Sequence, residues 1–345
     1  MAGGASSTRT SFVRDHFVGT VRVAVVGLGA VGTRAARQLA STDAVTSLVL
    51  RDDRDGRVDE VRASLGTKAE ADSPPPDEEV DADVVILATQ PGTQAEAARS
   101  FVESGTPVVT TTDRVAEVAA LLDLGPEAEA RQVPVAVGAT FSPGLTCLMT
   151  RLAAARLHTV DEIHIARLGT GGPACARQHH EALAGMALDW RDGGWQRRRA
   201  GSGRELNWFP DPIGAVDCYR AALPEPLLLV PAFAGVGRVT ARLAATRRDR
   251  LTSRLPMLTP PHAEGGLGAV RVEVRGRGEA GIEVVVLGAM DRPGVAAGAV
   301  SAVTAVELGA GRARRAGAGG LATLLDPKTV LAELARRGVK VAVFG

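Results

Sequence analysis

The chain has 345 residues, of which 45% are apolar, and a formal net charge of +1. This length favours two domains with substantial cores. The near-zero net charge gives no general attraction to nucleic acid or to membrane surfaces, and no stretch approaches the ~20 apolar residues of a membrane span. The three cysteines Cys147, Cys175 and Cys218 lie far apart, without a C-x-x-C pair. This is typical of a reduced protein, so we expect a cytoplasmic location with neither nucleic-acid nor membrane partners.

Residues 1–20 carry Ser, Thr, Gly and scattered charge, but not the apolar segment of a secretory signal. We interpret them as a flexible tail. Over residues 21–113, short apolar strands alternate with helical patterns. This rhythm predicts a doubly wound parallel sheet, that is, an α/β fold.

The clearest motif begins where the first strand, from Val23, reaches Gly27, Gly29 and Gly32 with the spacing G-x-G-x-x-G. Gly27 permits a tight turn, and Gly29 leaves room for a pyrophosphate beside the backbone. Gly32 lets the following helix pack close to the strand, so that its N-terminus faces the phosphates. The motif therefore predicts a dinucleotide site that includes Ala30 and Val31 at the start of the helix.

An acid follows the second predicted strand, 47–51, at the distance expected for a ribose ligand. Asp52 lies twenty positions after Gly32 and is followed by Asp53. Carboxylates there accept hydrogen bonds from ribose hydroxyls and repel a 2′-phosphate, which favours NAD. Arg51 and Arg54 are the cations that could instead hold that phosphate, so the cofactor is predicted as NAD or NADP with NAD favoured.

Two further strands, 83–88 and 107–112, continue the pattern, the first with an uninterrupted apolar run. Ligands of such folds bind beyond the carboxyl ends of the strands. We therefore place Thr89, Gln90 and Thr111 beside the cofactor. Helices are predicted over 93–104 and 115–122, and another strand over 134–137.

The segment from Gly138 to Thr146 reads G-A-T-F-S-P-G-L-T and enters an apolar helix. The glycine fingerprint, the V-V-I-L-A-T strand, the P-V-V-T-T-T-D segment and this turn, in that order, resemble the saccharopine dehydrogenase (saccharopine reductase) superfamily. The tail adds to the resemblance with Gly317-Ala-Gly-Gly320, a helix over 326–337 and a strand over 339–344. One departure is Ser142, because the family's turn usually carries an acid before Pro-Gly.

The resemblance implies a Rossmann domain over 21–144, an α+β substrate and dimerisation domain over 145–325, and a helix and strand over 326–345 that return to the Rossmann domain. It also implies an NAD(P)-dependent oxidoreductase, with a homodimer expected. A turn that leads into a helix presents N–H groups to anions. We accordingly expect the substrate to lie near Phe141, Ser142, Pro143 and Gly144.

The second domain contains a predicted strand over 160–167, a hairpin over 269–287 and a helix over 294–308. Residues 170–265 match no pattern that we assign. They hold the candidate proton carriers His179 and His180, with Glu181 beside them, because histidine titrates near neutral pH. His262 is a further candidate. Adjacent histidines lack the i, i+4 spacing of a helical zinc site, so no metal is predicted.

The scarcity of lysine separates this chain from dehydrogenases that use a catalytic lysine. Residues 69–327 contain no lysine, which excludes a catalytic lysine there. Gfo/Idh/MocA-type sugar dehydrogenases resemble the chain at the glycine fingerprint, but their Glu-Lys-Pro motif is absent after Thr110-Thr-Thr-Asp113.

We therefore expect a hydride transfer at a C–N or C–O carbon of a small, carboxylated, amino-acid-like metabolite. The alternatives are a non-catalytic dinucleotide-binding sensor or assembly protein, and a dehydrogenase of sugars or polyols. Arginine clusters such as 197–199 can clamp a carboxylate but are more often solvated.

Overall fold

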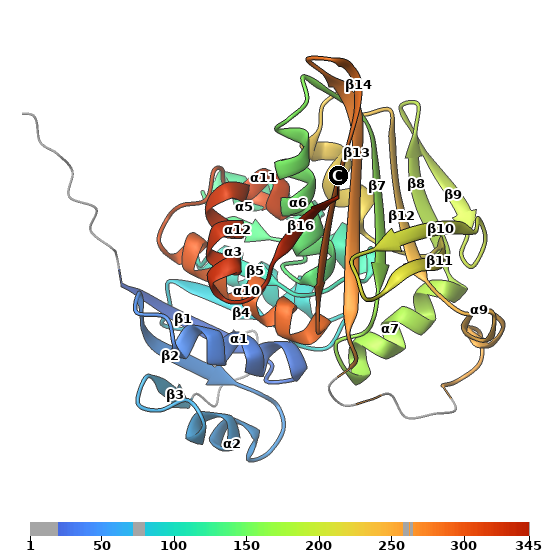
Figure 1. Ribbon diagram of the computed structural model, residues 1–345. Coiled ribbons are helices and arrows are strands. Elements are labelled where there is room, and N and C mark those ends of the chain that lie inside the picture. Colours follow the sequence, from blue (N-terminus) through green and yellow to red (C-terminus); the bar gives the residue numbers. More distant parts are fainter. Residues whose placement is uncertain (1–19, 72–79, 258–261, 263–264, 345) are drawn as a thin grey trace, which may run out of the picture.

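The computed structural model describes residues 20–71, 80–257, 262 and 265–344. The predicted tail therefore lies outside the described residues except for Thr20. The chain forms two sheets (Figure 1). Most of the buried apolar side chains of the sheets and their helices form one cluster, which includes Val25, Leu148, Ile165, Val272 and Val300. A second, smaller cluster around Phe209 lies on the second sheet.

The first sheet has seven parallel strands in the order β15-β6-β5-β4-β1-β2-β3. The order reverses direction at β1, which is the mark of a doubly wound fold. The predicted strands of the first domain are all present, and their central members are buried on both faces. The bounds are β1(Val21–Val26), β2(Val45–Arg51), β3(Ala69–Ala71), β4(Val84–Leu87), β5(Val108–Thr110), β6(Pro134–Ala136) and β15(Gly317–Gly319).

Helices cover both faces of this sheet. Helix α1 packs beside α10, which comes from far along the chain, and Gly298 of α10 allows this contact because a Cβ there would lie 2.5 Å from the Arg34 Cβ. Right-handed connections place α3 on the opposite face from α1. The helices are α1(Ala30–Ala40), α2(Arg57–Ala63), α3(Gln94–Glu103), α4(Val115–Asp123), α5(Gly125–Ala130) and α10(Pro293–Gly309).

The second sheet has nine strands. Seven of them pair in the order β10-β11-β12-β7-β13-β14-β16. The other two branch from this row, because β8 pairs with β12 and β9 pairs with β8. The pair β7–β12 is parallel and the other pairs are antiparallel. The bounds are β7(Thr159–Leu168), β8(Met186–Arg191), β9(Gly194–Arg199), β10(Glu205–Phe209), β11(Gly214–Arg220), β12(Arg238–Ala244), β13(Gly268–Gly278), β14(Gly281–Asp291) and β16(Val341–Phe344).

Helix α6 fills the space between the sheets and contacts β7, β13 and β14. A turn at Phe141–Leu145 leads into it. The other helices of this half are short, apart from α7 and α12. The bounds are α6(Thr146–Ala154), α7(Pro173–Ala184), α8(Glu225–Leu229), α9(Arg247–Thr252), α11(Leu321–Leu324) and α12(Pro327–Arg336).

The end of the chain requires a correction. The strand predicted near residue 340 does not return to the Rossmann sheet, because β16 pairs with β14 of the second sheet. The segment that does return is β15, which pairs with β6. The helix of the predicted return is α12, and just after it Arg337 bonds to Gln38 of α1. The strand β16 is a run of four apolar residues, and such a short run carries no local information on which sheet edge it joins.

Two other segments carry elements that the sequence patterns did not predict. The charged stretch after Asp52 contains α2 and β3. The described part of the unassigned segment, residues 170–257, folds into α7, the hairpin β8–β9, the hairpin β10–β11, α8, β12 and α9. The predicted hairpin of the second domain is confirmed as β13–β14. Two elements of the predicted second domain, α10 and β15, pack on the first sheet. The domain boundaries themselves stay a prediction.

Candidate functional site

A cavity of about 860 Å³ lies between the two sheets, at the carboxyl ends of β1, β2, β4 and β5. One wall comes from the Rossmann domain and the other from β7, the start of α7 and the start of α10. Of the predicted site residues, it is lined by Gly27, Gly29, Ala30, Val31, Asp52, Asp53, Thr89, Gln90, Thr111, Phe141 and Ser142.

The three glycines of the fingerprint have different surroundings. Gly27 has φ +91°, and a Cβ there would lie 2.6 Å from the Ala88 carbonyl. A Cβ on Gly32 would lie 1.8 Å from the Gly27 oxygen, so Gly32 sits behind the cavity and lets α1 approach β1. A Cβ on Gly29 would meet no atom within 4 Å. Gly29 thus borders open space at the start of α1, where no side chain caps the helix.

Asp52 lies at the end of β2, where its carboxylate is almost fully enclosed. It accepts the Leu28 N–H at 2.5 Å and pairs with Arg54, whose Nε lies 2.8 Å from Asp52 Oδ1. Burial opposes ionisation of this carboxyl, but the Arg54 and backbone hydrogen bonds prevail and lower its pKa. Asp53 and Arg54 also line the cavity, whereas Arg51 is buried.

Buried Gln94 fixes the loops after β4 and β5. Its Oε1 accepts the N–H groups of Thr111 and Thr112 at 2.9 and 3.1 Å, and its Nε2 donates to the Thr89 carbonyl at 3.0 Å. One amide side chain therefore holds both strand ends in register at the cavity. The first residue of α3 thus has a positioning role that its sequence context does not indicate.

The cavity lining also contains a buried ion pair that the sequence prediction missed. Arg167 Nη1 lies 2.7 Å from Asp113 Oδ2, with side-chain exposures of 9% and 11%. The same nitrogen donates to the Ser142 carbonyl. A signal was present in the alternation of β7, because Arg167 continues the buried face of Ile163 and Ile165. A cation on an apolar face requires a partner.

The turn before α6 contributes two cavity residues. Phe141 and Ser142 line the cavity, while Pro143 and Gly144 are buried behind it. A Cβ on Gly144 would lie 2.9 Å from the Gly138 oxygen, so Gly144 serves the packing of the turn. Ser142 shares a short hydrogen bond with buried Glu225 of α8. Only half of the predicted substrate turn therefore faces the cavity.

Neither predicted catalytic histidine lines the cavity. His179 bonds to the backbone of Ala244, and burial together with the nearby Arg167 lowers its pKa to about 4. The His180 Nε2 lies 2.9 Å from the Leu255 carbonyl oxygen. Both imidazoles thus face the β12–α9 side of α7, while Cys175 and Gln178 face the cavity. His262 is exposed and also lies outside the cavity lining.

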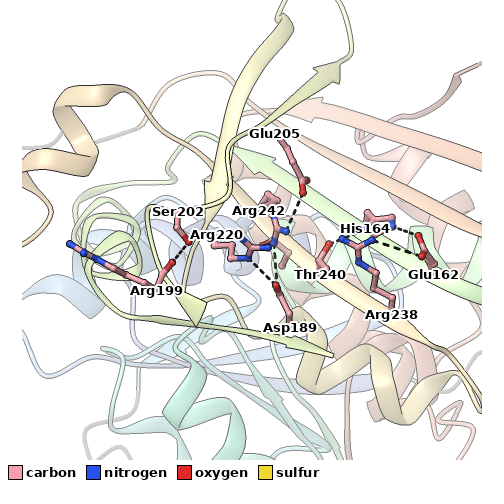
Figure 2. A network of polar contacts seen from close by, with 11 residues as sticks. Glu162, His164, Asp189, Arg199, Ser202, Glu205, Arg220, Arg238, Thr240 and Arg242 are labelled. Atoms are coloured by element: carbon pink, nitrogen blue, oxygen red, sulfur yellow. Dashed lines mark hydrogen bonds and ion pairs between the residues drawn. The ribbon is translucent and has the colours of Figure 1, made fainter. Parts of the chain in front are cut away.

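A separate polar network joins the strands β8, β10, β11 and β12 of the second sheet (Figure 2). Buried Arg242 of β12 pairs with Asp189 of β8 at 3.4 Å and with Glu205 of β10 at 3.2 Å, and Arg220 of β11 reaches the same aspartate. Four strands are therefore joined by charged groups, none of which lines the cavity. We assign this network a structural role.

Among the described residues, no group of three His, Cys, Asp or Glu side chains is arranged to hold a metal ion. Within the same residues, no helix is long and apolar enough to cross a membrane. The arginine clusters predicted as solvated stay outside the cavity lining, where Arg54, Arg167 and Arg177 are the basic residues.

Residues 21–139 match the model of the Gfo/Idh/MocA oxidoreductase family, which has an NAD-binding Rossmann fold. No curated protein sequence matches the chain. Among solved structures, the fold is similar to saccharopine dehydrogenase (L-Glu forming) from Saccharomyces cerevisiae, with 14% identity over 94% of this chain and 100% of that one, and a TM-score of 0.68. It is also similar to DAP dehydrogenase from C. glutamicum in complex with DAP, with 15% identity over 92% and 99% of the two chains and a TM-score of 0.50.

The family match covers the domain that carries the glycine loop, and the structural similarities cover both sheets. The resemblance noted in the sequence is confirmed at the level of fold. The chain is therefore an NAD(P)-dependent oxidoreductase whose residues 21–139 are similar to the NAD-binding Rossmann fold of the Gfo/Idh/MocA oxidoreductases and whose overall fold is similar to that of saccharopine dehydrogenase.

Proposed function

We propose that this chain transfers a hydride between NAD(P)(H) and the C–N or C–O carbon of a small, carboxylated, amino-acid-like metabolite. The observation that carries the proposal is Arg167, a cation enclosed in the cavity wall. It uses Nη1 for Asp113 and the Ser142 carbonyl, and its Nε has no partner among the described residues. A guanidinium has five donors in a planar fork that suits a carboxylate. The remaining donors can bind a substrate carboxylate in the cavity.

The cavity residues fit a dinucleotide. The open space beside Gly29 and the uncapped start of α1 suit a pyrophosphate, which the helix dipole would attract. Asp52 and Asp53 would lie at the adenosine ribose, and Thr89, Gln90 and Thr111 towards the nicotinamide. The bound nicotinamide would supply or accept the hydride, while the protein orients the substrate and excludes water.

We propose NAD(H) as the preferred cofactor. Asp52 and Asp53 line this end of the cavity against the single guanidinium of Arg54, and this excess of negative charge repels a 2′-phosphate. Arg51 is the other arginine that could hold the 2′-phosphate of NADP, but it is 2% exposed and does not line the cavity.

Thermal melting with NAD⁺, NADH, NADP⁺ and NADPH tests the cofactor, and a panel of amino, keto and hydroxy acids, sugars and polyols then tests the substrate class. We expect stabilisation by the NAD pair and oxidation of an amino or hydroxy acid. Turnover of sugars or polyols alone would favour the sugar-type alternative. Cofactor binding without any turnover would favour the sensor alternative.

We also propose a homodimer. Large apolar side chains are exposed on strands of the second sheet, with Trp208 of β10 at 62% and Ile282 of β14 at 85%, and a second copy of the chain could cover such side chains. Light scattering of the purified protein would measure the mass of the particle, and a mass of one chain would refute this proposal. The cytoplasmic location stays a prediction.

A further inference from the structure

A buried carboxyl group lies behind the part of the cavity lining that contains Phe141, Ser142 and Arg167, which we call the substrate wall. Glu225 is the first residue of α8 and has no exposed surface. Its Oε1 shares a short hydrogen bond with the hydroxyl of Ser142, which lines the cavity. Ser142 and Glu225 are 83 positions apart in the chain, so the contact is made by the fold rather than by a local turn. Ser142 is therefore positioned between Glu225 and the cavity.

The surroundings of Glu225 favour a neutral carboxylic acid. Its Oε2 is buried with no partner among the described residues, a costly arrangement for an ionised oxygen. The titratable groups that face it are Arg167, Asp113 and Cys147. Arg167 is already paired with Asp113, and burial raises the pKa of Glu225 despite the guanidinium and the Ser142 hydrogen bond. A neutral Glu225 leaves the Arg167–Asp113 pair balanced.

We propose that Glu225 is the proton store of the reaction and that the Ser142 hydroxyl passes its proton to and from the substrate. The proposal rests on the proposed function, since it concerns the same cavity. Glu225 acts through Ser142, so it is a positioning residue, whereas Ser142 is the group that touches the substrate. Neither histidine is needed for this role.

The transfer balances as follows in the direction of reduction. The hydride carries both electrons to the carbon of the C=O or C=N bond. The oxygen or nitrogen takes the Ser142 Oγ proton, and Oγ takes the carboxyl proton of Glu225, so that one O–H bond breaks for each bond formed. Glu225 is left as a carboxylate near Arg167, which stabilises it. After release of the product, a proton returns from water by way of Ser142.

The protonation of Glu225 can be measured without any substrate. Infrared difference spectra between the wild type and Glu225→Gln at neutral pH should show a carbonyl band of a protonated carboxylic acid that the variant lacks. Ser142→Ala should shift this band, since it removes the hydrogen bond. Glu117→Gln, at a second buried glutamate that accepts the Gln94 N–H, should leave the band in place. No such band at neutral pH would overturn the proposal.

Kinetics provide a second test once the panel yields a substrate. Glu225→Gln and Ser142→Ala should each lower kcat by about 10²-fold or more, with little change in KM. The limb of the pH profile that reports Glu225 should vanish in Glu225→Gln and return in Glu225→Asp. An unchanged pH profile in Glu225→Gln would overturn the relay. If the panel yields no substrate, the proposed function fails while the infrared result still decides the state of Glu225.

Discussion

The fingerprint glycines make a sharp test possible, because Gly29 and Gly32 have opposite surroundings. Gly29 borders open space at φ −72°, a conformation that any residue adopts. The variant Gly29→Val should therefore fold, with a change in the free energy of unfolding of about 1 kcal/mol or less. Its branched side chain would occupy the space in which we place the pyrophosphate, so cofactor binding should be lost.

The size of the effect follows from binding linkage. A cofactor at ~100 times its Kd stabilises the folded state by ~2.7 kcal/mol. The unfolding entropy of a 345-residue chain is about 0.7 kcal/mol/K, so saturation with NADH should raise the wild-type Tm by about 4 °C. Gly29→Val should show no rise while its cofactor-free Tm stays within about 1.5 °C of the wild type.

Two further variants serve as controls. Gly194→Val adds the same side chain in the β8–β9 hairpin, where its Cβ would have no neighbour nearer than 3.8 Å, and it should keep the full cofactor shift. Gly32→Ala places a Cβ 1.8 Å from the Gly27 oxygen and should lower the cofactor-free Tm by about 4 °C through overpacking of ~3 kcal/mol. A normal NADH shift in Gly29→Val would refute our placement of the pyrophosphate.

Three other predictions concern charged and titratable side chains, the first at the cofactor site and the other two in the stability of the fold. Asp52→Ala should weaken NAD(H) more than NADP(H) in fluorescence titrations, and an equal loss of both would mean that Asp52 does not reach the ribose. Arg167→Met should lower the free energy of unfolding by about 3–5 kcal/mol in urea because it leaves Asp113 enclosed and unpaired, and adding Asp113→Asn should restore part of the loss; full stability of the single variant would contradict the pairing. His179 has a folded pKa of about 4, below its unfolded value, so its contribution is present above pH ~6.5 and is lost as the pH falls to ~4, at a cost of about 3 kcal/mol. His179→Gln should flatten this acid-induced fall in Tm, and an unchanged fall would exclude His179 as its source.

The elements that position the cofactor could be predicted because their signals are local. The glycine spacing, the acid after the second strand and the apolar run of β4 each describe one strand and the loop after it. Parallel topology brings such loops to one edge, and the structure does place Asp52, Thr89 and Thr111 around one cavity. Their roles in binding stay predictions until they are tested.

The substrate wall could not be predicted in the same way, because its contacts join distant segments. Glu225 meets Ser142 across 83 positions, and Arg167 meets Asp113 across 54. The prediction of His179 and His180 as proton carriers rests on side-chain chemistry alone, which does not indicate which side of α7 faces the cavity. The prediction that β16 returns to the Rossmann domain is wrong for a related reason. Strand pairing depends on which other strands already occupy the edge of a sheet.

Both sheets receive an edge strand from the last thirty residues of the chain, because β15 extends the first sheet and β16 the second. During synthesis, the strands β1 to β6 leave the ribosome long before β15 exists. In the nascent Rossmann sheet, the β6 edge is therefore unpaired and α10 does not yet cover the face of the sheet. Such an uncovered edge exposes backbone groups to pairing with other chains. We expect the folding of this protein in the cell to depend on protection of that edge until β15 has left the ribosome and paired with β6.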